Sequence, residues 1–245
     1  MSERPRVLLI EDDASLQRFV QLALEDLDLE LLTAGSVDEG LAELARAPVA
    51  LIMTDLMLPG RSGFELVDSL AAQPALRAGA RLAVFSAGLN PETRQRLAPP
   101  KVWRLLSKPC SLAELEACVR DALSEAGRET ASSLAHPPAA GGMDGDQEAA
   151  IAQHFGGDAP LYHAFRASCL RQFRADMAEG ERACSSADAA ALRRLAHGLK
   201  SVLLTLGHAE ASALAQDLEG ASERADWGLA ERLWRQLKGA IATLR

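Results

Sequence analysis

Acidic, hydroxyl and basic side chains follow four short apolar runs in the first half of the chain, where they could act together. These side chains are Glu11, Asp12, Asp55, Ser86 and Lys108. A carboxylate held beside a divalent cation and a lysine can attack phosphorus, because the cation and the ammonium neutralise charge on the transferring phosphoryl group. Since carboxylates gathered in one crevice repel one another, we expect them to require a hard cation, and Mg²⁺ suits oxygen ligands.

One histidine in the second half of the chain has a reactive setting. His197 is followed by Lys200 and Ser201 at three and four residues, so all three lie on one face of a helix. Arg193 lies four residues before it, so cations flank the ring on both sides. Leucines and a valine can face the core while His197 points outward, and an exposed neutral imidazole beside a lysine can attack an acyl phosphate. We expect the other histidines to be surface or capping residues: His136, His154, His163 and His208.

Predicted strands and helices alternate along residues 1–125, and they would position the acidic, hydroxyl and basic side chains named above. Apolar runs predict strands at 7–10, 30–34, 49–54, 82–85 and 102–106. Helical patterns predict helices at 14–27, 37–46, 64–70, 91–97 and 112–124. Five strands alternating with helices predict a parallel α/β sheet covered on both faces. Ligands of such sheets bind outside the carboxyl ends of the strands, which is where the candidate side chains fall.

The second half of the chain has a different composition. Residues 127–147 are rich in Ala, Ser, Pro and Gly, which predicts a flexible linker. Turn signals then separate helical patterns at 147–155, 160–184, 189–206, 209–222 and 227–244. Short connections between long amphipathic helices predict an all-α antiparallel bundle. We therefore predict one domain at 1–125, a linker at 126–146 and a helical domain at 147–245.

Composition excludes several classes of protein. The chain has 245 residues, 48% apolar and 24% charged, which are ordinary globular values. Its net charge is −8 and neither half is basic, which argues against binding to nucleic acids or anionic membranes. No apolar run approaches the about 18 residues that span a bilayer, and no C-x-x-C pair occurs. We expect a cytoplasmic protein with reduced, mostly core cysteines.

The first half resembles the receiver domain of bacterial two-component response regulators. The segments that carry the resemblance are E-D-D, M-T-D-L-M-L-P-G-R-S-G-F, F-S-A-G and L-S-K-P, in that order over residues 5 to about 125. The resemblance implies a flavodoxin-like, doubly wound fold with a five-stranded parallel sheet. It also implies that Asp55 accepts the phosphoryl group, that Asp12 binds Mg²⁺ directly and Glu11 through water, and that the carbonyl of Met57 is a further ligand.

The same resemblance assigns the side chains after the last two strands. Ser86 would donate a hydrogen bond to the phosphoryl group and Lys108 would pair with it. The Lys108-Pro109 bond fits a cis peptide that aims the lysine into the crevice. Receivers often carry Tyr or Phe three residues before this lysine, whereas Leu105 stands here, so we do not expect output through that aromatic switch.

The second half resembles the histidine-containing phosphotransfer (HPt) domain. The string A-H-G-L-K, with Gly207 ten residues after the histidine, and the five-helix pattern carry this resemblance over residues 147–245. It implies that His197 is phosphorylated, that Lys200 stabilises the product, and that Glu219 can bond the other ring nitrogen. The family usually has Gly after the lysine; Ser201 stands there and could either crowd a partner or donate a hydrogen bond.

Three other activities fit the sequence poorly. A haloacid-dehalogenase-type phosphatase needs a second Asp two residues after the nucleophile, where Met57 stands. A histidine kinase would have Glu after the histidine and an ATP-binding domain, whereas Gly198 follows here and only 48 residues remain. A DNA-binding regulator needs a basic recognition helix, and residues 126–245 contain two lysines.

We therefore expect a phosphorelay protein that moves a phosphoryl group between Asp55 and His197. It would not be an enzyme with an ATP-binding kinase domain, although its receiver would catalyse its own phosphorylation and dephosphorylation. Its expected partners are a sensor histidine kinase, hybrid or orthodox, and a downstream response-regulator receiver, with no nucleic acid and no membrane. The alternative is a phosphorylation-gated binding module that docks on a histidine kinase or receiver to inhibit or sequester it.

Overall fold

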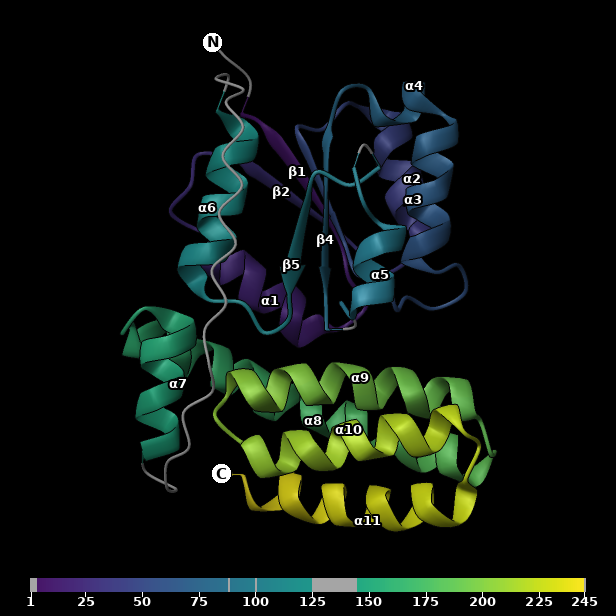
Figure 1. The fold of residues 1–245 in the computed structure, drawn as a ribbon. Coiled ribbons are helices and arrows are strands. Elements are labelled where there is room, and N and C mark those ends of the chain that lie inside the picture. Colours follow the sequence, from purple (N-terminus) through teal and green to yellow (C-terminus); the bar gives the residue numbers. More distant parts are fainter. Residues whose placement is uncertain (1–3, 88, 100, 125–144, 245) are drawn as a thin grey trace.

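A computed structural model shows an α/β domain followed by a helical domain (Figure 1). It describes residues 4–87, 89–99, 101–124 and 145–244. The linker predicted at 126–146 falls almost entirely outside the described residues. The domain boundaries drawn from composition therefore stay predictions.

The α/β domain contains the five-stranded parallel sheet that the sequence predicts. Its strands are β1 (Arg6–Ile10), β2 (Glu30–Ala34), β3 (Leu51–Thr54), β4 (Arg81–Ser86) and β5 (Arg104–Ser107). They pair in the order β2-β1-β3-β4-β5, and every pairing is parallel. The central strands β1 and β3 are buried on both faces, because each is an almost unbroken apolar run. Their carboxyl ends therefore meet at one edge of the sheet.

Helices cover both faces of this sheet. They are α1 (Ala14–Ala23), α2 (Val37–Arg46), α3 (Gly63–Ala72), α4 (Pro74–Arg77), α5 (Pro91–Arg96) and α6 (Leu112–Leu123). α1 and α6 contribute to the apolar cluster on one face, and α2 and α3 to the cluster on the other. The helix predicted at 14–27 ends at Ala23, and Leu27 packs against the core from the connection to β2. The short α4 was not predicted.

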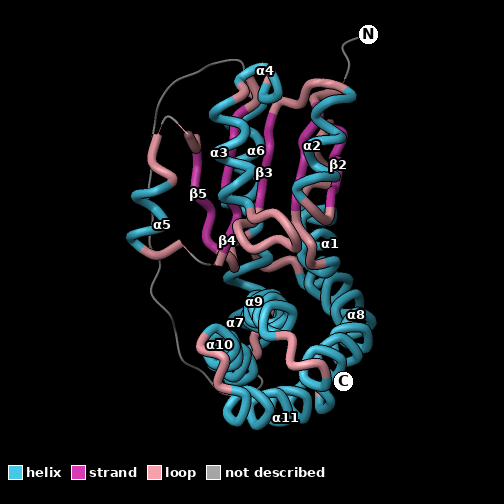
Figure 2. The backbone as a smooth tube through the Cα atoms, turned by 90° about the vertical axis from the view of Figure 1, so that its right-hand side faces the viewer, coloured by secondary structure: helices cyan, strands magenta, loops and turns pink. Residues whose placement is uncertain are grey.

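The helical domain follows its predicted pattern closely. Its helices are α7 (Gly145–Phe155), α8 (Ala159–Ser185), α9 (Ala189–Thr205), α10 (Ala209–Glu223) and α11 (Trp227–Thr243). Asp158, Asp188 and Asp226 each cap a helix, since each carboxylate accepts a hydrogen bond from the backbone of the first turn. Figure 2 shows α8 to α11 nearly end-on, arranged around a common core. α7 lies outside this bundle and contacts α6 and α8.

The two domains are in contact, a point that the sequence left open. The bundle lies below the carboxyl ends of the strands, where α1 packs on α8 (Figure 1). Phe19 of α1 makes edge contacts with Phe155 and Phe165 of the helical domain, at ring-centroid distances of 5.7 and 5.5 Å. One cluster of buried apolar residues therefore runs through both domains. Burial of a phenylalanine side chain of this kind contributes about 1.5 to 3 kcal/mol.

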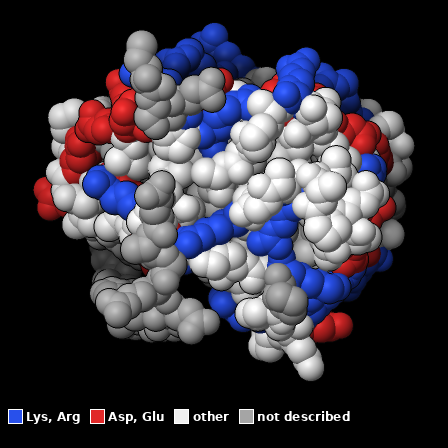
Figure 3. All heavy atoms as spheres, turned by 90° about the horizontal axis from the view of Figure 1, so that it is seen from above, with Lys and Arg blue, Asp and Glu red and all other residues white. Residues whose placement is uncertain are grey.

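The face of the molecule seen from above in Figure 1 carries both basic and acidic side chains (Figure 3). Several surface cations of the α/β domain are paired. Lys101 Nζ lies 3.0 Å from an oxygen of Asp68, and an Arg104 nitrogen lies 2.8 Å from an oxygen of Asp121. Exposed pairs of this kind contribute roughly 0 to 1 kcal/mol each, so they define surface charge more than stability.

Candidate functional site

Strand ends bring three ionisable side chains together inside the α/β domain. Glu11 follows β1, Asp55 follows β3 and Lys108 follows β5, and all three are buried. Lys108 Nζ donates to Asp55 Oδ2 at 2.7 Å and also donates to Glu11 Oε2. The Lys108-Pro109 peptide is cis, as the sequence indicated. The topology of the sheet thus joins residues that are 53 and 97 positions apart.

The other oxygen of Asp55 is held by the backbone that follows it. Oδ1 accepts hydrogen bonds from the N–H groups of Leu56 and Met57, the second at 3.3 Å. Burial alone would raise the pKa of Asp55, but Lys108, His197 and a hydrogen bond with Ser86 outweigh burial and hold that pKa below its usual value. Asp55 is therefore a carboxylate, the form that can act as a nucleophile.

The predicted magnesium ligands lie around Asp55 and Lys108. Asp12 is exposed at the rim, and desolvation together with the charge of Asp55 raises its pKa to about 6. Carboxylate oxygens of Glu11, Asp12 and Asp55 and the carbonyl of Met57 are the donors that a hard cation prefers, so the residues fit Mg²⁺ in kind. Within the described part of the chain, no three His, Cys, Asp or Glu residues surround a common point. Lys108 instead bridges the carboxyl groups of Glu11 and Asp55, and burial raises the pKa of Glu11 to about 8.

The helical domain holds one ring nitrogen of His197. Nδ1 lies 2.7 Å from Oε1 of Glu219 on α10, and Lys200 Nζ donates to the other oxygen of Glu219 at 2.6 Å. Burial alone would raise the pKa of Glu219, but its hydrogen bonds with His197 and Lys200 and the charge of Lys200 lower it to about 2. An ionised Glu219 can only accept, so Nδ1 carries the proton and donates it. A neutral ring then has its lone pair on Nε2.

That second nitrogen faces the other domain. His197 Nε2 has no hydrogen-bond partner among the described residues and lies 4.0 Å from Asp55 Oδ2. The prediction of an exposed imidazole was wrong for this arrangement, since His197 is only 4% exposed. The ring does point out of its own bundle, but the α/β domain covers it. The structure thus places Nε2 of His197 opposite Oδ2 of Asp55, two candidate site atoms that the sequence put in separate domains.

The cations expected around His197 are both paired. Lys200 bonds to Glu219, and an Arg193 nitrogen lies 2.9 Å from an oxygen of Glu223. The ammonium therefore reaches the imidazole through the shared carboxylate, rather than directly. Glu219, which the resemblance suggested only weakly, is the centre of this network.

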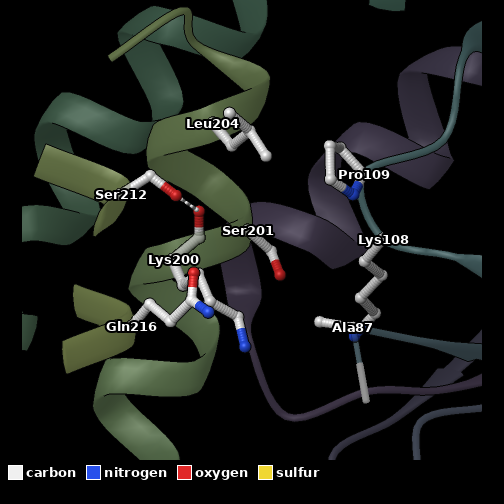
Figure 4. Close-up of a pocket in the computed structure, with 8 residues that line it drawn as sticks. All are labelled: Ala87, Lys108, Pro109, Lys200, Ser201, Leu204, Ser212 and Gln216. Atoms are coloured by element: carbon white, nitrogen blue, oxygen red, sulfur yellow. Dashed lines mark hydrogen bonds between the residues drawn. The ribbon is translucent and has the colours of Figure 1, made fainter. Parts of the chain in front are cut away.

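A small cavity lies at the seam between the domains, beside Lys108. It has a volume of about 170 Å³ and is lined by Ala87, Lys108, Pro109, Lys200, Ser201, Leu204, Ser212 and Gln216 (Figure 4). Ser201 is 1% exposed, and its hydroxyl faces this cavity without a hydrogen-bond partner in the described ranges. Ser201 therefore does not prevent the domains from docking. Leu105, the other departure from the family pattern, packs against the apolar cluster under α2 and α3.

Asp13 beside the site was not singled out, and His154 of α7 differs from expectation. Asp13 caps α1, since its Oδ1 accepts from the N–H groups of Ser15 and Leu16 at 2.7 and 3.1 Å. His154, expected at the surface, is buried, and burial lowers its pKa.

All four cysteines are free thiols as predicted, and three of them are buried.

Comparisons with known proteins fit this geometry. Residues 7–120 match the family model of the response regulator receiver domain, and residues 164–245 match that of the Hpt domain. The chain joins a receiver domain to an Hpt domain. These two domains together indicate a two-component phosphorelay protein. No helix in the described part of the chain is both long and apolar enough to cross a bilayer.

Individual relatives cover the chain to different extents. The Sensory/regulatory protein RpfC of Xanthomonas campestris is 25% identical over 97% of this chain and 32% of its own length. The Sensor histidine kinase TmoS of Ectopseudomonas mendocina is 32% identical over 50% of this chain and 12% of its own length. The KDP operon transcriptional regulatory protein KdpE of Escherichia coli is 31% identical over 51% of this chain and 54% of its own length. The chain thus spans about half or less of the length of these curated relatives.

Among solved structures, the chemotaxis response regulator CheY4 of Vibrio cholerae is similar to the receiver domain. It is 25% identical, and the match covers 49% of this chain and all of CheY4, with a TM-score of 0.45.

Proposed function

We propose that a phosphoryl group passes within this chain between Asp55 of the receiver domain and His197 of the Hpt domain. The observation that carries the proposal is the position of His197 Nε2, which is buried, lacks a partner among the residues described, and lies 4.0 Å from Asp55 Oδ2. A reactive pair held in one molecule gains from proximity, because no second molecule has to be captured for each transfer.

The proposed step exchanges one bond to phosphorus for another. The lone pair of Nε2 forms a bond to phosphorus while the bond between phosphorus and Oδ2 breaks, and Oδ2 keeps the electron pair. The ring becomes cationic, its Nδ1 proton stays in place, and the carboxylate of Glu219 stabilises the new charge. Asp55 returns to a carboxylate paired with Lys108. Transfer from His197 to Asp55 runs through the same atoms in reverse.

Mg²⁺ is part of this proposal as the partner of the receiver site. Glu11, Asp12, Asp55 and the carbonyl of Met57 would hold it, and it would supply charge neutralisation on the phosphoryl oxygens. The chain's own contribution is Lys108, whose ammonium already contacts Oδ2, and Ser86, whose hydroxyl would bond the same phosphoryl group.

The partners and the setting follow from the same chemistry. We propose that a sensor histidine kinase, hybrid or orthodox, exchanges phosphoryl groups with the chain and that a downstream receiver takes them up. The alignment with RpfC over 97% of the chain supports partners of this class. The chain would use no ATP itself, while its receiver would catalyse its own phosphorylation and dephosphorylation. We also propose the cytoplasm as its compartment, which the four free thiols support.

A chemical-stability assay tests the proposal. The full chain is incubated with acetyl phosphate and Mg²⁺. Base-labile phosphate, which is acyl phosphate, and acid-labile phosphate that survives base, which is phosphohistidine, are then measured in wild type, Asp55→Ala and His197→Ala. Wild type should form both kinds of phosphate. Asp55→Ala should lose both, because His197 is loaded through Asp55, and His197→Ala should lose only the acid-labile kind. Absence of acid-labile phosphate from wild type would overturn the intramolecular transfer.

The second candidate is a phosphorylation-gated binding module. It is favoured by the apolar contact of Phe19 with Phe155 and Phe165, which phosphorylation could loosen to expose a docking surface. In that case the wild type forms no phosphohistidine, and a histidine kinase or receiver still binds to His197→Ala.

A further inference from the structure

The backbone next to His197 makes an unusually close contact with the receiver domain. Gly198 is the single glycine of α9, and a Cβ atom at that position would lie 2.7 Å from Oδ2 of Asp13. Real Cβ atoms do not approach an oxygen this closely, so any other residue at 198 requires either Asp13 or α9 to shift. The contact exists only because residue 198 has no side chain.

Asp13 cannot easily move out of the way. Its Oδ1 accepts two hydrogen bonds at the start of α1, from the N–H groups of Ser15 and Leu16. α1 itself is fixed against the Hpt domain through Phe19. Rotation of the Asp13 carboxylate would therefore give up the cap of the helix that docks the two domains.

We propose that Gly198 is a positioning residue that admits this chain's own receiver domain, and that the pair Asp13–Gly198 determines the specificity of the transfer. The inference rests on the proposed function. Gly198 adjoins His197, and Asp13 is held by the cap of α1, so a side chain at 198 moves Nε2 away from Asp55 Oδ2. A misplacement of about 1 Å between reacting groups can slow a reaction about 100-fold.

A rescue experiment in the full chain tests this pairing. Gly198→Ala should slow formation of acid-labile phosphate from acetyl phosphate by about 100-fold, while base-labile phosphate at Asp55 forms at the wild-type rate. Alanine is a better helix former than glycine, so α9 remains folded. Asp13→Ser shortens the interfering side chain and keeps a capping hydroxyl. Combined with Gly198→Ala, it should restore the transfer to within a few-fold of Asp13→Ser alone.

Gly239→Ala is the matched control. Gly239 lies in α11, and a Cβ there would meet no atom within 4 Å apart from its chain neighbours and the backbone of its own helix, so this change should leave the transfer at the wild-type rate. The proposal is overturned if Gly198→Ala transfers as fast as Gly239→Ala, or if Asp13→Ser does not rescue it.

A second readout separates this inference from the proposed function. Hydrogen–deuterium exchange of α1 and α8 reports docking without any phosphotransfer. Gly198→Ala should increase exchange in both helices, and Asp13→Ser in the same chain should reverse the increase. If wild type makes no phosphohistidine but this pattern holds, the proposed function fails while the docking role stands. Unchanged exchange in Gly198→Ala overturns the docking role.

Discussion

Asp55 and His197 are both buried, but their surroundings are built in different ways. Both oxygens of Asp55 are bonded within the receiver domain, Oδ1 by the backbone and Oδ2 by Lys108. Only one nitrogen of His197 is bonded within the Hpt domain, by Glu219. The aspartate site is thus complete in its own domain, whereas the histidine site is completed by docking.

The difference follows from the two architectures. A parallel sheet brings residues from distant parts of the sequence to one edge, so several groups can surround Asp55. A helix offers neighbours at three and four residues and one adjoining helix. The second ring nitrogen of a helical histidine therefore faces outward, and another domain has to supply the remaining groups of the site.

The largest expected effect is a loss of stability, and it tests whether the Asp55 site is held together within the receiver domain. Lys108→Ala removes the cation that pairs with the buried carboxylate of Asp55, and breaking a buried pair costs about 3 to 5 kcal/mol. We expect the free energy of unfolding of the receiver domain to fall by that amount in urea titrations. Lys101→Ala, which removes an exposed ion pair, is the control and should cost at most about 1 kcal/mol. Equal midpoints for the two variants would contradict the prediction.

A smaller effect is expected when docking of the two domains is weakened, because this should slow phosphorylation of His197 without changing that of Asp55. Phe19→Ala removes an aromatic ring from the contact between domains, and truncation of a buried Phe costs about 3 kcal/mol or more. We expect phosphohistidine to form at least about tenfold more slowly, because the docked state is less populated, with acyl phosphate retained at Asp55. Phe64→Ala on the opposite face of the sheet is the matched control and should leave phosphohistidine formation unchanged.

The smallest effect concerns the half of the histidine site that its own domain provides. Glu219→Gln keeps an acceptor for Nδ1 but removes the negative charge that stabilises the cationic ring. We expect the transfer to slow by about tenfold, equivalent to about 1.4 kcal/mol, with Asp55 phosphorylation unaffected. The rate of appearance of acid-labile phosphate measures this effect.

The same variant has a defined dependence on pH. Glu219 has a pKa of about 2 in the folded chain and an ordinary value of 4.5, so its contribution to stability is present above pH 4.5 and is lost as the pH falls toward 2. The difference in unfolding free energy between wild type and Glu219→Gln should therefore narrow over that range. A difference that stays constant from pH 5 to pH 2 would show that the charge of Glu219 does not stabilise the fold.

Residue types and spacing predicted the sheet, the bundle and most of the site. Asp55 and Lys108 could be assigned because polar residues at the ends of buried strands share an edge. The burial of His197 could not be predicted, since helical periodicity shows which face is polar but not what covers it. The covering depends on the contact between Phe19 and Phe155. These two residues belong to different domains and lie on opposite sides of the predicted linker in the sequence.

Local capping was predictable in kind but not always in detail. Ser111 and Glu114 form a full capping box, as their spacing indicates. Ser36 caps α2, but Glu39 reaches the N–H of Gly35 instead of returning to Ser36. A spacing rule identifies the helix start, while competing backbone donors decide which bond the carboxylate makes.

The seam around Asp55 and His197 also has a kinetic meaning under the proposed function. Water reaches neither reactive atom freely while the domains are closed, and exclusion of water suppresses hydrolysis of reactive intermediates. Domain openings commonly occur in microseconds to milliseconds. The lifetime of the phosphoryl group on either residue would then be governed by how often the seam opens.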